Sequence, residues 1–537
     1  MSAAMRRYDD RYKPALSLVV VFIIVAAWVF AIFKTYKIPE GQFFRGFYYA
    51  AMSTPDNFRL WLPPLLALLW GIALFAVINS YTTTHFGIAD FVMQLRGPRI
   101  RSAAELIDAC REFGKKQLRL MGVPVPTRLE NLHFEAVGST GSGKSQVIAD
   151  YLESAHERGD RTIVIDPNGG FMSEFYKEGD YILNPFDQRG QAWSIFNEIQ
   201  TPYDVEQFSV SLIPKSPSTE QEQWNAMART IVAETMLKLC KLGKNTTQQL
   251  VYWLTIASND ELQKMLADTA AAGMFHGADE TLGSVRTVLT RYITAHKYLQ
   301  DPVKGEVPFS IRRWLDNPNG GNLWVPWRED MLPALKPLIA CWTDVICASL
   351  LSADVDSAHD MHLVIDELDS LDKLNYLVQA ATKARKHKLH LFCGFQSYAQ
   401  LDETNGKNDA LTLRNSLRNS VSLGVADKDT YTANEIHKAI GEITVTRRRT
   451  TLSGGTAGAR ATTNLDSVTE YLVSPADVHN LPALTGYVKL AEDVGVARVK
   501  LKYKKRPSVT EKLIIIKGKW TDPIKPETRR FAAAAKA

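Results

Sequence analysis

The chain has 537 residues, of which 45% are hydrophobic and 23% are charged, and its formal net charge is +5. This ordinary globular composition lets most of the chain bury a core, and the length predicts about two to four domains. The mildly basic charge is compatible with nucleic acid but does not predict it. Five cysteines without a Cys-x-x-Cys pair argue against a disulfide or zinc framework and indicate reduced thiols.

Two uncharged apolar runs near the N-terminus, residues 15–33 and 60–78, are each long enough to cross a membrane. A cleaved signal peptide is the weaker interpretation, because the first run is too long and a second one follows. Basic residues are nearly balanced around the runs, so charge alone does not fix their orientation. The connecting loop, 34–59, has aromatic residues that suit the interfacial belt or a partner: Phe43, Phe44, Phe47, Tyr48 and Tyr49.

The strongest motif is Gly-Ser-Thr-Gly-Ser-Gly-Lys-Ser at 138–145, the full P-loop pattern, between a predicted strand over 132–137 and a predicted helix. Its glycines let backbone N–H groups surround a phosphate at the start of the helix. Lys144 can reach the β- and γ-phosphates, and Ser145 can hold Mg²⁺. Because ATP is cytoplasmic, both termini are expected in the cytoplasm. The predicted nucleotide-binding residues are Gly138, Ser139, Thr140, Gly141, Ser142, Gly143, Lys144, Ser145 and Gln146.

Strands and helices alternate on both sides of a purely helical stretch. A strand over 162–165 ends at Asp166, which is placed near the nucleotide if it is not simply a turn residue. Strand signals almost vanish over 204–300, which predicts an all-α insertion in an α/β domain. The alternation resumes with a strand at 323–325 and a helix over 332–351.

A second motif follows this helix. An apolar run ends in Asp366 and Glu367, a Walker B pattern in which the first carboxylate binds the Mg²⁺ shell and the second orients the attacking water. The next predicted strand, 389–394, precedes Gln396, which can sense the γ-phosphate. The basic stretch 383–388 is either a solvated face or the source of an arginine for a neighbouring subunit's nucleotide.

The C-terminal third gives weaker signals. We expect a helix over 371–385 and a strand over 421–425. Residues 447–463 begin with three arginines and are rich in Thr and Gly, which predicts a mobile basic loop that meets phosphates or is simply solvated. A half-exposed strand is expected over 499–503, and the tail that ends at Ala537 is expected to be disordered.

In this order the motifs resemble those of the type IV coupling proteins of conjugative plasmids, nearly from end to end. The resemblance implies a hexameric RecA-like motor on the inner membrane, with a channel for one DNA strand and the all-α domain at the cytoplasmic end. The matching stretches are the paired spans, 130–145, 165–170, 183–187 with Trp193, 363–367, 385–400, 427–442 and 472–482.

The resemblance also implies roles for single residues. Lys144 corresponds to the phosphate-binding lysine, and Ser145 and Asp366 correspond to the metal-binding residues. Glu367 corresponds to the catalytic carboxylate and Gln396 to the sensing glutamine. Arg385 corresponds to the arginine that acts on the adjacent subunit. Asn168 departs from the family, since many relatives have lysine there, which puts a phosphate role of that turn in doubt. A long C-terminal tail that docks a relaxosome protein in some relatives has no counterpart here.

The expected fold is therefore α/β: a RecA-like P-loop NTPase domain with an inserted all-α domain and two N-terminal transmembrane helices. The expected divisions are a hairpin (1–80), a connector with the first part of the nucleotide domain (81–203), the all-α domain (204–300), the second part (301–510) and a tail (511–537).

The expected function is an ATP- and Mg²⁺-dependent inner-membrane motor that recruits a relaxase–DNA complex and pumps single-stranded DNA into a type IV secretion system. Its expected partners are further copies in a hexamer, the relaxase, accessory relaxosome proteins, inner-membrane secretion components and lipid. One alternative is a receptor in which ATP binding controls only assembly. Another is a chromosome-segregation pump for double-stranded DNA, although the additional spans and the winged-helix end of such pumps are not visible.

Overall fold

The computed structural model describes residues 12–36, 43–83, 93–276, 279–299, 307–355, 359–453, 460–492 and 494–516. These residues fall into two compact units. The first is drawn from Met1–Glu105 and His437–Asp477, and the second from Leu106–Ile436 and Val478–Ala537.

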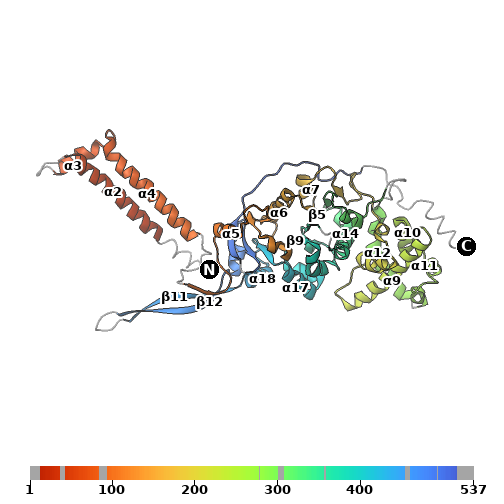
Figure 1. Ribbon diagram of the computed structural model, residues 1–537. Helices are drawn as coiled ribbons and strands as arrows, with labels where there is room; N and C mark the ends of the chain where they lie inside the picture. The colour runs from red at the N-terminus through yellow and green to blue at the C-terminus, as the bar shows by residue number, and fades with distance from the viewer. Residues whose placement is uncertain are drawn as a thin grey trace. The chain divides into compact units, whose positions relative to one another are not determined.

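The first unit contains a helical hairpin. Helices α2 (Tyr12–Thr35) and α4 (Phe58–Thr83) pack along each other, as Figure 1 shows in red and orange. The expected connecting loop is wrong in part, because Phe43–Met52 forms the short helix α3. Phe43 stacks on Phe33 of α2 with ring centroids 5.9 Å apart, and Phe47, one turn later, packs on the buried cluster of the hairpin. These aromatic contacts at i and i+4 favour a helix over a loop.

A three-stranded antiparallel sheet completes this unit, in the order β1-β11-β12, from β1 (Met93–Arg96), β11 (Glu442–Ser453) and β12 (Arg460–Tyr471). The mobile loop predicted over 447–463 is therefore wrong where the structure describes it, since 447–453 and 460–463 belong to the two strands of a long β-hairpin; 454–459 lie outside the described residues. Its threonines are β-branched and suit strands. Arg447 forms an ion pair with Glu470 on the opposite strand, and Ile443 and Val445 are buried.

The second unit is built on a nine-stranded mixed sheet in the order β14-β13-β10-β4-β9-β8-β5-β7-β6. The strands from β10 to β6 are parallel, whereas β13 and β14 extend the sheet antiparallel. Parallel strands bring their carboxyl ends to one edge of the sheet. The strands are β4 (Phe134–Val137), β5 (Arg161–Pro167), β6 (Tyr181–Ile182), β7 (Leu323–Trp327), β8 (Met361–Ile365), β9 (Leu389–Phe395), β10 (Asn419–Ser422), β13 (Thr485–Leu490) and β14 (Gly495–Lys500).

This sheet confirms the predicted α/β class. The expected strands over 421–425 and 499–503 are displaced toward the N-terminus, since β10 and β14 end at Ser422 and Lys500. The expected helix over 371–385 begins later, because Asp344 accepts a hydrogen bond from the Tyr376 N–H (2.7 Å) at the start of α15. The remaining helices outside 202–299 are α5 (Ala103–Cys110), α6 (Lys144–Arg158), α7 (Gly170–Phe175), α13 (Ile311–Asp316), α14 (Leu332–Ser352), α15 (Leu377–Lys383), α16 (Tyr398–Asn405), α17 (Lys407–Ser416), α18 (Thr430–Ile440) and α19 (Pro475–His479).

Helix α14 is the one helix in the described ranges that is long and apolar enough to cross a membrane, but 78% of its apolar window is buried inside the protein. Such burial is typical of a core helix. Two shorter apolar stretches, Val20–Thr35 and Phe58–Ala73, lie in the hairpin of the first unit.

Between Pro202 and Leu299 the described residues form helices and turns without a strand, in agreement with the predicted loss of strand signal. These helices gather together in Figure 1, drawn from yellow to green. They are α8 (Pro202–Leu212), α9 (Thr219–Lys241), α10 (Thr247–Val251), a π-helical turn (Tyr252–Ile256), α11 (Asn259–Met265) and α12 (Asp279–Ile293).

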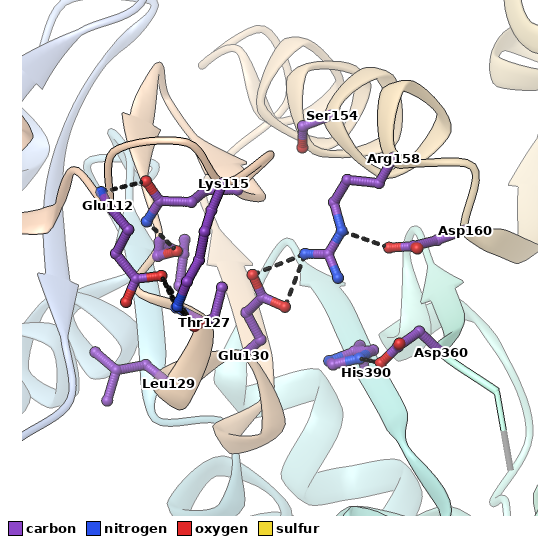
Figure 2. A network of polar contacts seen from close by, with 12 residues as sticks. Glu112, Lys115, Thr127, Leu129, Glu130, Ser154, Arg158, Asp160, Asp360 and His390 are labelled. Carbon is purple, nitrogen blue, oxygen red and sulfur yellow. Dashed lines mark hydrogen bonds and ion pairs between the residues drawn. The ribbon is translucent and has the colours of Figure 1, made fainter.

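The amino edge of the sheet carries a network of buried ion pairs (Figure 2). Arg158, in the last turn of α6, donates to both carboxylate oxygens of Glu130 at 2.8 Å and lies 2.8 Å from Asp160. Beside it, His390 of β9 contacts the carboxylate of Asp360 at 2.9 Å. The network joins the ends of α6, β5, β8 and β9, and so fixes the sheet on the side away from the P-loop.

Candidate nucleotide-binding site

The P-loop runs from the end of β4 to Ser145, the second residue of α6. The Gly138 N–H donates to the carbonyl of Phe395, at the end of β9 (3.1 Å), and the Ser139 N–H donates to the carbonyl of Gly424, just past β10 (2.9 Å). The loop is therefore attached to the strands on both sides of its own strand. This attachment holds its amides at the carboxyl edge of the sheet, where helix α6 begins.

At two of the P-loop glycines there is no room for a side chain. A Cβ added to Gly138 would lie 2.7 Å from the Leu423 Cβ atom, and one added to Gly143 would lie 2.7 Å from the Leu484 side chain. Gly143 also has a φ of 110°, a conformation that residues with a side chain rarely adopt. The sequence between the strand and Lys144 can therefore take this path only with glycine at both positions.

The loop forms the floor of a cavity of about 350 Å³. This volume lies in the range of small-molecule sites. Of the predicted residues, most of the P-loop, Gln146, Glu367 and Gln396 line the cavity, whereas Gly138, Ser142, Asp166, Asp366 and Arg385 do not. The lining residues are Ser139, Thr140, Gly141, Gly143, Lys144, Ser145, Gln146, Glu367, Gln396, Ala483, Leu484 and Tyr503.

Lys144, which lines the cavity, forms a buried pair with Asp366, which does not. The Lys144 Nζ atom is 3.9 Å from the Asp366 Oδ1 atom, and both side chains are less than a tenth exposed. This Oδ1 atom has no hydrogen-bond partner. Burial raises the pKa of Asp366 to about 6, and the charge of Lys144 opposes that rise. A buried carboxylate oxygen without a donor is the kind of group that a cation satisfies, so the site fits Mg²⁺.

Glu367 and Gln396 also line the cavity. The Gln396 Nε2 atom donates to the Glu367 Oε1 atom (2.8 Å), and the Thr140 hydroxyl donates to the Gln396 Oε1 atom (3.5 Å). Glu367 has a φ of 58°, a strained conformation for a residue with a side chain that is often found at functional sites. A continuous chain of hydrogen bonds thus links the P-loop to the second carboxylate of the Walker B pattern.

The sequence analysis did not identify Asp369. Its Oδ2 atom accepts from the N–H groups of Gln396 (3.0 Å) and Ser397 (3.2 Å), and so it positions the glutamine. The only available signal was a third carboxylate close behind Asp366 and Glu367. Ala483, Leu484 and Tyr503 were missed as well, because no motif marks them.

Two predicted residues lie elsewhere. Asp166 is the second-last residue of β5, at the carboxyl edge of the sheet, but it is fully buried and accepts from the N–H groups of Met172 (2.7 Å) and Phe171 (3.3 Å), so it caps α7. Burial raises the pKa of Asp166 to about 7. Arg385 is exposed and precedes β9, whose seven residues separate it by roughly 20 Å from the cavity edge. Arg385 therefore does not reach the cavity of its own chain.

Comparison with known proteins decides the family. The model of the type IV secretion-system coupling protein DNA-binding domain matches residues 117–502. The chain belongs to the type IV coupling proteins. Coupling protein TraD of Escherichia coli (strain K12) is 31% identical to this coupling protein over 491 residues, which are 87% of this chain and 67% of TraD. The predicted resemblance is thereby confirmed, and with it a place in conjugative type IV secretion.

Solved structures of the bacterial conjugative coupling protein TrwB have the same fold as this coupling protein. The unbound form of TrwB is 39% identical, with a TM-score of 0.76 over 80% of this chain and 99% of that one. TrwB has also been solved with ADP and Mg²⁺, at the same identity and a TM-score of 0.74 over 80% of this chain and 98% of TrwB. A further TrwB structure contains a non-hydrolysable GTP analogue, with the same identity and TM-score over 80% of this chain and 99% of TrwB.

Proposed function

We propose that this coupling protein is an ATP-driven motor that moves single-stranded DNA toward a type IV secretion channel. The observation that carries the proposal is the cavity in which the P-loop, Glu367 and Gln396 meet, with Lys144 of its lining 3.9 Å from the buried Asp366. The ADP and Mg²⁺ bound by TrwB, a protein of 39% identity, support the same ligands here.

The phosphates would lie on the P-loop amides, with Lys144 neutralising the terminal oxygens. Ser145, exposed at the cavity wall, and Asp366, with its unsatisfied oxygen, are the residues that would hold Mg²⁺. When bound, the ion supplies Lewis-acid neutralisation of charge on the phosphate oxygens.

Glu367 is the group that would orient and polarise the attacking water. Its hydrogen bond to Gln396 holds the carboxylate in the cavity, and Gln396 in turn touches Thr140 of the P-loop. Any change at the terminal phosphate would therefore alter the contacts of both side chains. Arg385, too far from its own cavity, would act on the nucleotide of the next subunit in a hexamer.

We propose that α2 and α4 cross the bacterial inner membrane, with 34–59 outside and the second unit in the cytoplasm. The polar contacts of the hairpin lie at its turn, where the Tyr36 and Ser53 hydroxyls are 2.9 Å apart and Trp28 donates to Thr54 (3.1 Å). An apolar surface with a polar end is what lipid requires. Along the helices, large apolar side chains are exposed: Phe22, Val25, Phe30, Leu66, Leu69, Trp70 and Ile72.

The substrate would be the strand carried by a relaxase, handed over with accessory relaxosome proteins and passed to inner-membrane components of the secretion system. The helical segment 204–300 would be the docking domain. Contacts of a motor to the DNA backbone are electrostatic, so DNA affinity should fall steeply with salt.

The test is ATP turnover of the full chain with and without single-stranded DNA. Lys144→Ala should lower turnover at least about 100-fold, since removal of one charge stabiliser at a reaction centre costs this much. Lys407→Ala, an exposed lysine at the start of α17, is the matched control and should leave turnover unchanged. Turnover that ignores DNA in an assembled oligomer would contradict the motor and favour a receptor.

A further inference from the structure

Part of the cavity lining is apolar and comes from the C-terminal part of the chain. It consists of Ala483, Leu484 and Tyr503. Tyr503 lies on an extended segment, 501–516, that follows β14 and leaves the sheet. The tyrosine side chain is 63% exposed although the segment is well attached, so the ring is presented to the cavity and not buried for stability.

Hydrogen bonds fix the backbone on both sides of Tyr503 to the P-loop region. Before it, the Leu501 N–H donates to the Leu484 carbonyl (2.7 Å), and the Leu484 N–H donates to the carbonyl of Ser142 in the P-loop (2.8 Å). The segment therefore cannot move away from the loop without breaking at least one of these bonds.

After Tyr503, the segment is held to the first turns of α6. The Lys504 N–H donates to the side-chain oxygen of Gln146 (3.3 Å), and so does the guanidinium of Arg506. Arg506 also forms an ion pair with Glu153, with 3.1 Å between the guanidinium nitrogen and the carboxylate oxygen. The arginine side chain of this pair is largely buried. The ring position is thus set by α6, the helix that begins at Lys144.

The cavity lining therefore combines two kinds of chemistry. The P-loop amides, Lys144 and Glu367 suit a triphosphate. Ala483, Leu484 and the exposed ring of Tyr503 offer an apolar surface. We propose that Tyr503 is the platform on which the nucleobase stacks, an inference that rests on the proposed nucleotide site. Stacking uses the face of a base and ignores its edge, so this platform accepts adenine and guanine alike.

The experiment measures the affinity of the full chain for three Mg²⁺ complexes: a non-hydrolysable ATP analogue, the GTP analogue and inorganic tripolyphosphate. Tyr503→Ala should weaken binding of both analogues about tenfold or more, the usual loss when an aromatic partner of a base is removed. Tripolyphosphate, which has no base, should bind the variant as it binds the original protein. Tyr503→Phe retains the ring and should restore both analogues to within about twofold.

Tyr203→Ala is the matched control, because this tyrosine is 71% exposed on α8 and does not line the cavity. Unchanged analogue affinity in Tyr503→Ala would overturn the inference and leave the proposed function standing. An equal loss for tripolyphosphate would also overturn it, since the residue would then support the P-loop and not the base. If the original protein bound neither analogue, the proposed function would fail first.

Discussion

At the carboxyl edge of the nine-stranded sheet, Asp366 has a buried oxygen with no hydrogen-bond partner, 3.9 Å from Lys144. At the amino edge of the same sheet, both oxygens of Glu130 accept from Arg158 at 2.8 Å (Figure 2). The two edges use the same kinds of side chain and are similarly buried. They differ in whether the chain itself satisfies the charges.

This difference separates a binding site from a structural network. Buried polar groups are normally paired, and an unpaired one raises the free energy of the empty protein. At the amino edge, Asp160 contacts both Arg158 (2.8 Å) and His362 (3.0 Å), so its carboxylate is already paired within the chain. At the carboxyl edge the unsatisfied oxygen belongs to the residue that the Walker B pattern assigns to the metal.

The largest effect is expected at the carboxyl edge. Glu367→Gln should lower ATP turnover about 10²- to 10⁴-fold and leave nucleotide affinity nearly intact, because the amide cannot act as a base but keeps the size of the side chain. Turnover and analogue binding should be measured on the same preparation. Glu403→Gln, an exposed glutamate on α16, is the control. Turnover within about twofold of the original would remove Glu367 from the mechanism.

At the amino edge, Arg158→Met should act on stability instead. It leaves Glu130, which is 3% exposed, and Asp160 without their cation, and breaking a buried pair on one side costs roughly 3 kcal/mol of unfolding free energy. Urea unfolding checks the loss. Analogue affinity of the folded variant should match that of the original protein; a selective loss of nucleotide binding would show that the two edges are not separate in function.

Glu135, on β4, tests the rule itself, because its Oε2 atom is also without a partner although the residue does not line the nucleotide cavity. Here burial raises the pKa from its ordinary value of 4.5 to about 7, against the hydrogen bond from Tyr398. The folded protein therefore keeps a proton that the unfolded chain releases, and stability is lost as the pH rises through this window. Glu135→Gln should stabilise the protein by roughly 3 kcal/mol at pH 8 and hardly at pH 4.5.

Urea unfolding of this variant and of the original at both pH values is the measurement. The amide can still accept from the Tyr398 hydroxyl, so the substitution isolates the charge. An equal gain at both pH values would mean that charge burial is not the cause, and destabilisation at pH 8 would show that the surroundings stabilise the ionised carboxylate.

The smallest effect is expected at the exposed end of the network in Figure 2. Glu112 lies 3.1 Å from the Lys115 Nζ atom, and both side chains are partly exposed. Glu112→Gln should change the unfolding free energy by less than about 1 kcal/mol, because solvent screens exposed pairs. A loss as large as that of Arg158→Met would mean that the network acts as one unit.

The sequence alone determined the P-loop, the Walker B carboxylates and Gln396. It also determined that strands and helices alternate along the chain on both sides of a helical stretch. These features depend on neighbours in the chain: glycines that a tight loop requires, and apolar runs whose period matches a strand or a helix. The ordered set of motifs was also sufficient for the family, which the comparisons confirmed. The membrane spans, the hexamer and the domain divisions remain predictions.

The tertiary structure decided what depends on distant residues. The β-hairpin that replaces the loop expected at Arg447 forms because a second strand, ending at Tyr471, lies beside the first. Asp166 points to the amides of α7, a choice that strand position does not reveal. Tyr503 reaches the nucleotide cavity because Lys504 bonds to Gln146, 358 residues earlier in the chain. The local sequence pattern does not predict such contacts, because only the folded backbone brings their partners within hydrogen-bonding distance.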